Sequence, residues 1–326
     1  MAHSFFNATT GKVWPLDINT PLDDDVARTA RHAYYAAVSF MDHQVGRILD
    51  ELEALGLAEN TLVVLHGDHG AWRTSVPCGT YNDSDPSSHS CFFLFFSGWQ
   101  LGEHNSWHKY TNFELGARVP LIMRAPWMKL SIGAVTQGLA ELVDSYPTVA
   151  ALVGAGTPTD ALDGVSLVPF FEDPTRTSFP TTTSLGTNNK TLAFSQYPHG
   201  DNGALVPGTA CPFYDAAKKT CTASPGRSGL ENSKKVAWMG FSVRDQSWRY
   251  TAWLPFNGTL AIWDAEVIEE LYNHTASDGT DFDLMDTDNL AYRNEVTKAM
   301  AKEYFALVKM QFAVLAPSLG VPCTKP

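Results

Sequence analysis

An acidic residue and a histidine follow a short apolar run early in the chain. The run Leu62-Val63-Val64-Leu65 stops at the polar turn Gly67-Asp68-His69-Gly70. A short apolar stretch bounded by glycines is typical of a strand buried on both faces. Ligands bind at the carboxyl ends of such strands, and a carboxylate beside an imidazole is a candidate half of a metal site. Taken alone, the pair also fits an alternative in which Asp68 caps a following helix and His69 is an ordinary loop histidine.

A second candidate segment runs from Trp99 to Glu114 and is dense in side chains that donate, accept or titrate. Aromatic residues stand between these polar groups, a composition more typical of a site-forming loop than of a solvated one. Lys109 is the side chain with most chemical meaning, because a fixed cation can hold an anionic group of a substrate. The alternative is an exposed surface lysine.

A long amphipathic helix is predicted before the apolar run. Thr20-Pro21-Leu22-Asp23 resembles a helix start, with Thr at the N-cap and Pro at the first helical position. Apolar residues then recur at spacings of three and four, which predicts one buried face. These residues are Tyr34, Val38, Met41, Val45, Ile48, Leu52 and Leu55, and Gly56 follows as a stop signal. Helix, connector, buried strand and polar turn make one unit of a parallel α/β sheet.

The middle of the chain carries weaker signals. Residues 118–124 are predicted to form another short buried strand with a proline near its start. Apolar spacing predicts a helix over residues 139–153, with a break or second start near Pro147. Residues 157–190 are expected to be loop-like.

The pattern changes beyond this polar boundary. Aromatic and β-branched runs predict antiparallel strands at 192–197, 236–243 and 248–254, and helical periodicity returns at 296–312. We therefore predict two domains: residues 1–190 as an α/β domain and residues 191–326 as a smaller α+β domain with an antiparallel sheet.

Composition excludes some functions. The chain has 326 residues, 44% of them hydrophobic, with a net charge of −12, so a sizeable core is expected. No strongly basic run is present, which argues against nucleic acid as a partner. Attraction of an anionic substrate therefore requires a local basic pocket or a metal. No apolar stretch is long enough to predict a membrane span.

Compartment signals are mixed. The residues that follow Met1 do not read as a signal peptide, yet Asn-x-Ser/Thr sequons stand at five positions, which is typical of a secretory glycoprotein. They begin at Asn7, Asn82, Asn189, Asn257 and Asn273. The five cysteines show no zinc spacing. Cys211 and Cys221 flank a polar loop and either close a small disulfide ring or remain free thiols.

Three blocks, in this order, resemble the sulfatase family and in particular its iduronate-2-sulfatase-like members. The first is Tyr34 to Arg47; the second joins Gly67-Asp68-His69-Gly70 to the stretch from Leu101 to Tyr110; the third comprises Phe194 to Pro198, Met239 to Arg244 and Arg249 to Trp253. The resemblance implies an alkaline-phosphatase-like α/β fold that hydrolyses sulfate esters of small molecules or glycans. It also implies a secretory location, either lysosomal or extracellular.

The resemblance assigns roles to four residues. The family's nucleophile is a formylglycine, made from the cysteine of C-x-P-S-R or C-x-A-S-R, and Ca²⁺ with lysines holds the sulfate oxygens. Asp68 and His69 match two of the metal ligands; the carboxylate suits calcium better than the imidazole does. Lys109 matches the catalytic lysine that contacts sulfate, and Lys109 and His104 match substrate-binding positions.

This sequence departs from the family pattern in ways that bear on activity. No cysteine is followed by x-P-S-R or x-A-S-R, and the paired aspartates of the family's first strand have no counterpart. Asp23-Asp24-Asp25 reads instead as a helix start. We therefore expect a C-terminal portion of a sulfatase that lacks the nucleophile, binds calcium weakly and is inactive alone.

Residues 71–98 interrupt the second block. Without them Gly70 would join Trp99, which restores a close family match. Their end, Phe92-Phe93-Leu94-Phe95-Phe96-Ser97, is encodable as a pyrimidine tract before a splice acceptor. The hypothesis is a retained intron or a gene-model error; the alternative is a genuine insertion that forms a surface loop.

Two other functions stay open from the residues. One is hydrolysis of phosphoesters or phosphonates on the same fold. The other is a non-catalytic binding module that keeps the fold and an anion pocket but no nucleophile, because fold alone does not fix function.

Overall fold

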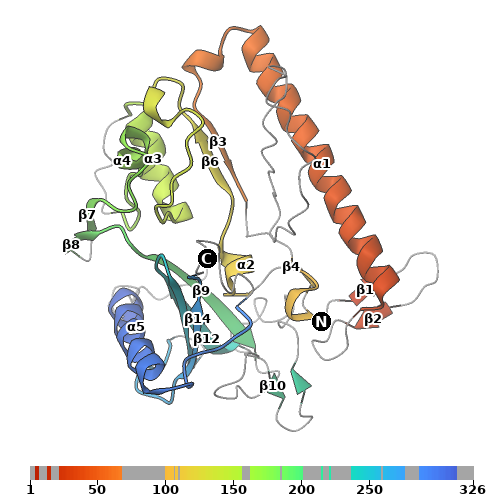
Figure 1. Ribbon diagram of the computed structural model, residues 1–326, viewed down its shortest axis with the longest axis vertical. Helices are drawn as coiled ribbons and strands as arrows, with labels where there is room; N and C mark the ends of the chain where they lie inside the picture. The colour runs from red at the N-terminus through yellow and green to blue at the C-terminus, as the bar shows by residue number, and fades with distance from the viewer. Residues whose placement is uncertain are drawn as a thin grey trace, which may run out of the picture.

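The computed structural model describes residues 4–6, 13–15, 22–67, 100–105, 107–108, 111–155, 162–183, 186–200, 214–215, 220–221, 236–257, 260–275 and 286–313. Figure 1 shows two groups of elements: helices and short strands from the described residues up to 190, and a four-stranded sheet with its helix from the later residues. Asp68, His69, Lys109, the segment 71–98 and all five cysteine side chains lie outside the described residues.

Helix α1 (Asp24–Ala54) begins a few residues later than predicted. Asp23, not Thr20, is the N-cap: its Oδ1 accepts the backbone N–H of Asp25 at 3.0 Å and that of Val26 at 3.4 Å. A carboxylate at this position satisfies the free donors of the first turn and complements the helix dipole. The helix ends before Gly56, whose φ of 69° suits a glycine that follows a helix.

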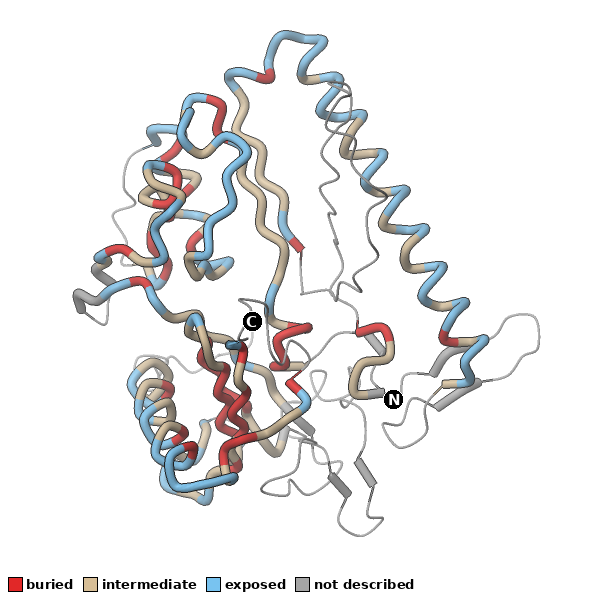
Figure 2. Tube along the Cα trace, in the orientation of Figure 1, coloured by how far each residue is buried: buried red, intermediate tan, exposed pale blue. Residues whose placement is uncertain are grey.

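The prediction that the apolar face of α1 is buried is wrong. Ala27 is the helix's buried residue, whereas Ile48 is 63% and Leu55 61% exposed. Ala27 packs against Leu101 near the start of the helix, and Figure 2 shows an alternation of half-buried and exposed residues along the rest. The spacing identified the stripe correctly, but a stripe is buried only where another element covers it.

Strand β3 (Val63–His66) pairs with β6 (Leu121–Arg124) in antiparallel register, with Val63 opposite Arg124. The parallel unit predicted here is therefore wrong for this pair. The reason lies in the connection: the Gly67 N–H donates to the Pro120 carbonyl at 3.0 Å, so the chain leaves β3 and returns to β6 at the same end. A parallel pair would need a crossover to the opposite end. Val63 to Leu65 are half-buried, not fully buried as predicted.

Short elements make up the rest of the first group. The strands are β1 (Ser4–Phe6), β2 (Val13–Pro15), β4 (Gln100–Leu101), β5 (Trp107–His108), β7 (Pro180–Thr183) and β8 (Gly186–Asn189), paired β1·β2, β4·β5 and β7·β8. The helices are α2 (Glu114–Ala117), α3 (Ser145–Leu152) and α4 (Val168–Glu172), with 3₁₀ turns η1 (Ala58–Asn60), η2 (Glu103–Asn105), η3 (Lys129–Ser131) and η4 (Leu142–Asp144).

Two predictions for this region need correction. Helix α3 is shorter than the predicted 139–153, because the 3₁₀ turn η4 precedes it; Pro147 lies in its first turn, where a proline is tolerated. The stretch 157–190, expected to be loop-like, includes α4 and the hairpin β7–β8 among its described residues.

The second group is an antiparallel sheet of order β14-β13-β12-β9. Its strands are β9 (Ala193–Gly200), β12 (Val236–Arg244), β13 (Trp248–Pro255) and β14 (Ile268–Asn273), and helix α5 (Glu295–Ala313) covers one face (Figure 1). The three predicted strands and the terminal helix are confirmed. A small antiparallel pair, β10 (Tyr214–Asp215) and β11 (Thr220–Cys221), lies between β9 and β12 in the sequence.

The two faces of this sheet differ in chemistry. The face toward α5 is apolar and packs on Ala301 and Val308 of the helix; it consists of Phe241, Val243, Tyr250, Ala252, Leu254 and Leu271. The opposite face carries buried polar residues: Ser242, Arg244, Arg249, Thr251 and Glu270. The register places Ser242 opposite Thr251 and Arg244 opposite Arg249, so this polar face is continuous across neighbouring strands.

Candidate functional site

The strand that leads to Asp68 and His69 has a fixed end. Gly67 is buried, and its N–H extends the β3·β6 ladder by one hydrogen bond to Pro120. The preceding His66 ring lies 3.0 Å, through Nδ1, from the Gly67 carbonyl oxygen. The backbone is therefore held up to the residue before Asp68.

The segment that leads to Lys109 is a small hairpin held against α1. Gln100 pairs with His108 and Leu101 with Trp107. The backbone carbonyl of Leu101 accepts the Nε–H of Arg31 at 2.8 Å. The backbone N–H of Leu101 donates to Glu103 Oε2 at 2.5 Å. Gly102, between them, has a φ of 116°, which a residue with a Cβ would adopt only under strain.

His104 is the one predicted site residue whose position the described part of the chain gives. It lies in η2, half-buried, with a left-handed φ of 53°. Its imidazole stacks on the ring of Phe113, with ring centroids 4.2 Å apart and planes 9° apart. Phe113 in turn meets Tyr272 of β14 edge to face, at 6.2 Å. His104 is thus connected through Phe113 to the C-terminal sheet.

Asn112 also binds to this sheet. Its Nδ2 donates to the Gly240 carbonyl of β12 at 3.0 Å, and its own carbonyl accepts from Arg249 Nη1 at 3.2 Å. A Cβ at Gly240 would lie 2.6 Å from the Trp253 ring and 2.8 Å from Asn112 Nδ2. The close approach of Asn112 to the sheet therefore requires glycine at this position.

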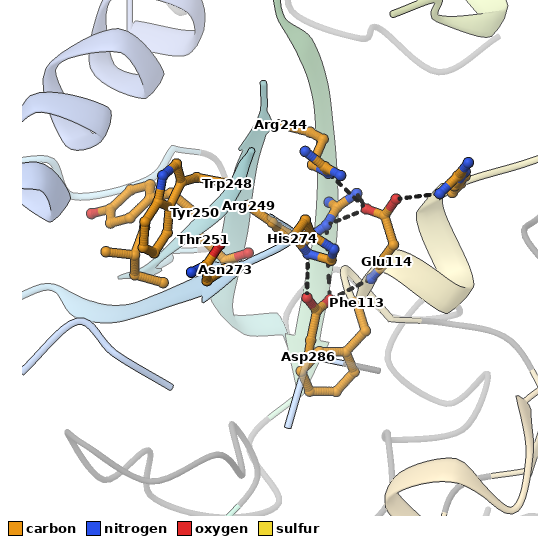
Figure 3. Close-up of polar contacts among 12 residues, drawn as sticks. Phe113, Glu114, Arg244, Trp248, Arg249, Tyr250, Thr251, Asn273, His274 and Asp286 are labelled. Atoms are coloured by element: carbon orange, nitrogen blue, oxygen red, sulfur yellow. Dashed lines mark hydrogen bonds and ion pairs between the residues drawn. The ribbon is translucent and has the colours of Figure 1, made fainter. Parts of the chain in front are cut away.

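Glu114 lies at the centre of a buried network of charges (Figure 3). Its Oε2 accepts from Arg249 at 2.9 Å (Nε) and 2.5 Å (Nη2), and from Arg244 Nε at 3.3 Å. Its backbone N–H donates to Asp286 Oδ2 at 2.5 Å. The other Asp286 oxygen lies 2.9 Å from His274 Nε2. We name Asn112, Glu114, Arg244, Arg249, His274 and Asp286 the charged cluster.

The cluster is electrostatically balanced around Glu114. Burial opposes ionisation of this carboxyl group, but the charges of Arg249, Arg244 and His274 outweigh that effect and lower its pKa from 4.5 to about 2. Glu114 is therefore an anion at any physiological pH. For Asp286, burial is the largest influence and raises its pKa, although His274 and Arg249 act in the opposite direction.

Glu270, on the polar face of the sheet, has a pKa shifted in the opposite direction to that of Glu114. It is fully buried, and desolvation raises its pKa from 4.5 to about 8; a hydrogen bond with Trp253 opposes the rise and the nearby Asp286 adds to it. Glu270 is therefore mainly neutral at pH 7. Glu114 of α2 and Glu270 of the sheet thus hold opposite protonation states, because of these two carboxyl groups only Glu114 has arginine partners.

A second buried ion cluster lies elsewhere. Lys190 Nζ is 2.5 Å from Glu141 Oε2 and 2.9 Å from Asp144 Oδ2. The remaining oxygens of the two acids accept backbone N–H groups of Phe194 and Val165. These groups satisfy one another, and the cluster joins η4 to the start of β9, so we interpret it as structural.

The described residues do not form a metal site by themselves. Among them, no three His, Cys, Asp or Glu side chains come together in a way that could hold a metal ion. The predicted ligands Asp68 and His69 lie outside these residues, so we derive no catalytic step through calcium. No described helix has the length and apolarity to cross a membrane.

Comparisons with known proteins identify sulfatases similar to this chain. Residues 3–155 match the family model described as "Sulfatase". The chain is 27% identical to human iduronate 2-sulfatase over 276 residues, which cover 73% of this chain and 40% of the relative. It is 38% identical to mouse steryl-sulfatase over 143 residues, 44% of this chain and 20% of that protein. The chain therefore spans about two fifths of the length of the iduronate 2-sulfatase that it matches.

Solved structures agree on the fold. A candidate sulfatase from Bacteroides thetaiotaomicron superimposes with a TM-score of 0.56 and 18% identity, covering 91% of this chain and 45% of that one. BT1596, described as a 2-O GAG sulfatase, gives a TM-score of 0.50 at 19% identity, covering 85% and 41%. The predicted alkaline-phosphatase-like α/β class is thereby confirmed, although every pairing of the described strands is antiparallel.

Proposed function

We propose that this chain, whose residues 3–155 match the sulfatase family model, belongs to the sulfatase family and supplies part of the active site of a hydrolase acting on sulfuric esters. The observation that carries this proposal is the paired anchoring of two segments. β3 and the Gly67–Pro120 hydrogen bond fix the approach to Asp68, while the β4–β5 hairpin fixes the approach to Lys109.

In this proposal Lys109 contributes a fixed positive charge beside the sulfate group. Such a charge lowers the barrier to S–O cleavage because it stabilises the negative charge that develops on oxygen in the transition state. His104, held against Phe113, would contact the same substrate through its imidazole. Asp68 and His69 would hold calcium, and the carboxylate suits that cation. Calcium, when bound, would supply charge to the sulfate oxygens.

The nucleophile is not among these residues. No cysteine of the chain stands in a C-x-P-S-R or C-x-A-S-R sequence, so we propose that the formylglycine comes from a polypeptide segment outside the 326 residues. The substrate we propose is a 2-O-sulfated uronic-acid glycan, because the iduronate 2-sulfatases match 73% of this chain, whereas steryl-sulfatase matches 44%.

We also propose a secretory location. Asn189 and Asn257, which head two of the five sequons, are exposed in the structure, as glycan acceptors must be. A mobility shift of the secreted protein on treatment with an N-glycosidase tests this proposal. An unchanged mobility would contradict it.

The function is tested by hydrolysis of a 2-O-sulfated iduronate disaccharide with calcium present. We expect no turnover by the 326-residue chain, and turnover by a longer product of its gene that carries C-x-P-S-R. That turnover should be lost in Lys109→Met and retained in Lys129→Met, a control at an exposed lysine paired with Glu59. Turnover by this chain alone that Asp68→Asn abolishes would overturn the need for an outside nucleophile.

Other outcomes of the same assay would favour the alternatives. Faster hydrolysis of the matched phosphate ester by the longer product would indicate a phosphoester hydrolase. Binding of the disaccharide without turnover by that product would indicate a non-catalytic binding module.

A further inference from the structure

Two residues with strained backbone conformations contact the Phe113–Glu114 dipeptide. Among the described residues, His104 and Asp286 are the non-glycine residues with positive φ, at 53° and 52°. His104 stacks on Phe113, and Asp286 accepts the N–H of Glu114, the next residue along the chain. Left-handed backbone at residues other than glycine is sparsely populated and persists where the surroundings enforce it, often at functional sites. The Phe113–Glu114 dipeptide therefore joins two such positions.

The dipeptide is also where the chain from Lys109 enters the C-terminal sheet. Glu114 is bound by side chains of β12 and β13 (Arg244 and Arg249) and by Asp286, which follows β14. Phe113 contacts Tyr272 of β14, and Asn112 binds Gly240 of β12. These contacts come from residues more than a hundred positions later in the chain. They fix residues 112–114, which follow Lys109 by three positions in the sequence.

We propose that Asn112, Glu114, Arg249 and Asp286 are positioning residues: they bind residues 112–114 to the C-terminal sheet and thereby set the place of His104 and of the β4–β5 hairpin, which precedes Lys109 in the sequence. The significance of Lys109 rests on the proposed function; the mechanical coupling between the sheet and His104 does not.

The charges that face Glu114 support a role in placement. Arg249 and Arg244 approach from the sheet, Arg118 lies 3.7 Å from Oε1 on its own helix, and Asp286 with His274 approaches from the far end. The Arg249 guanidinium contacts Glu114 through two nitrogens and the Asn112 carbonyl through a third. A planar fork bound at three points fixes orientation as well as distance, which a lysine could not do.

The direct test is the ring-current shift of the His104 imidazole protons by NMR. A ring stacked 4.2 Å above Phe113 places the His104 signals upfield of those of an exposed histidine. Phe113→Leu abolishes the shift and assigns the resonance. We expect Asp286→Asn and Asn112→Ala to move it toward the exposed value, and hydrogen exchange of backbone amides in 100–108 to accelerate at least tenfold.

A matched control separates placement from general stability. Lys190→Met breaks a similarly buried ion cluster whose partners are Glu141 and Asp144. We expect it to lower the melting temperature while leaving the His104 shift and the exchange in 100–108 unchanged. Arg249→Met is the strongest variant but leaves Glu114 without its main partner; Asn112→Ala, which keeps every charge of the cluster, tests the proposal if Arg249→Met does not fold.

Two results would overturn the proposal: an unchanged His104 shift in folded Asp286→Asn and Asn112→Ala, or an equal change in Lys190→Met. Inorganic sulfate then tests the step that rests on the proposed function. Its affinity should fall about tenfold in Asn112→Ala and stay constant in Lys190→Met. If the unaltered chain binds no sulfate while the His104 shift still responds as expected, the proposed function fails and the coupling stands.

Discussion

The Glu114 carboxylate lies 2.5 Å from the Arg249 guanidinium, and both side chains are almost fully buried, at 3% and 4% exposure. The pair connects the end of the Lys109 segment to the middle of the C-terminal sheet. Removing one partner would leave the other as an uncompensated buried charge, which costs far more than an exposed pair.

This pair gives a stability prediction. Arg249→Met should lower the free energy of unfolding by about 3–5 kcal/mol, because Glu114 would keep its charge without its main partner. Arg293→Met, which breaks a half-exposed pair with Asp288, should cost at most about 1 kcal/mol. Urea unfolding followed by fluorescence measures both. Equal losses in the two variants would contradict the buried-charge explanation.

A pH dependence follows from Glu270. Its pKa is about 8 in the folded chain against 4.5 when unfolded, so the folded state retains a proton that the unfolded state releases. The contribution of Glu270 to the free energy of unfolding is fully present below pH 4.5. It is lost as the pH rises from 4.5 through 8, by up to about 1.4 kcal/mol per pH unit. The raised pKa of Asp286 acts in the same direction.

Thermal unfolding between pH 5 and 8 measures this dependence. The melting temperature should fall as the pH rises, and Glu270→Gln should flatten the curve. Glu114 has the opposite sign: its pKa is depressed to about 2, so its contribution is present above pH 4.5 and is lost as the pH falls toward 2. A melting temperature that rises from pH 5 to 8 would contradict the assignment of Glu270.

Gly240 gives a packing prediction. A Cβ there would overlap the Trp253 ring and the Asn112 side chain, so Gly240→Ala should destabilise the chain by about 1–3 kcal/mol. Gly46, in α1, has nothing within 4 Å of a built Cβ, so Gly46→Ala should stabilise by up to about 1 kcal/mol. Differential scanning calorimetry of the two alanine variants checks the contrast. A neutral Gly240→Ala would show that the sheet and Asn112 are not in close contact.

Sequence reasoning found the elements that have strong local patterns. The run Trp248–Pro255 and helix α5 bury apolar residues at regular spacing, and both were predicted. Strand β14 was missed because Glu269 and Glu270 interrupt its apolar pattern. The fold accommodates both acids. Tyr250 donates its hydroxyl to Glu269 at 2.7 Å, and burial raises the pKa of Glu270 so that its carboxyl group is mainly neutral. Local pattern cannot reveal such compensation.

The candidate site divides in the same way. Motif resemblance drew attention to Asp68, His69, His104 and Lys109, and the assignments of these residues stay predictions. The charged cluster was not predicted, because Glu114 and Arg249 meet across 135 positions of sequence. One signal was available: Arg249 stands inside the predicted apolar strand 248–254, and a charge inside a strand that is otherwise buried requires a partner.

The most direct test of the central claim is whether Lys109 and Asp68 serve one sulfate group. Binding of a 2-O-sulfated uronate disaccharide to the 326-residue chain, in millimolar calcium, can be followed by ligand-observed NMR. We predict weak binding that Lys109→Met and Asp68→Asn each abolish and that Lys129→Met leaves unchanged. Equal binding by the unaltered chain and by Lys109→Met would contradict the claim.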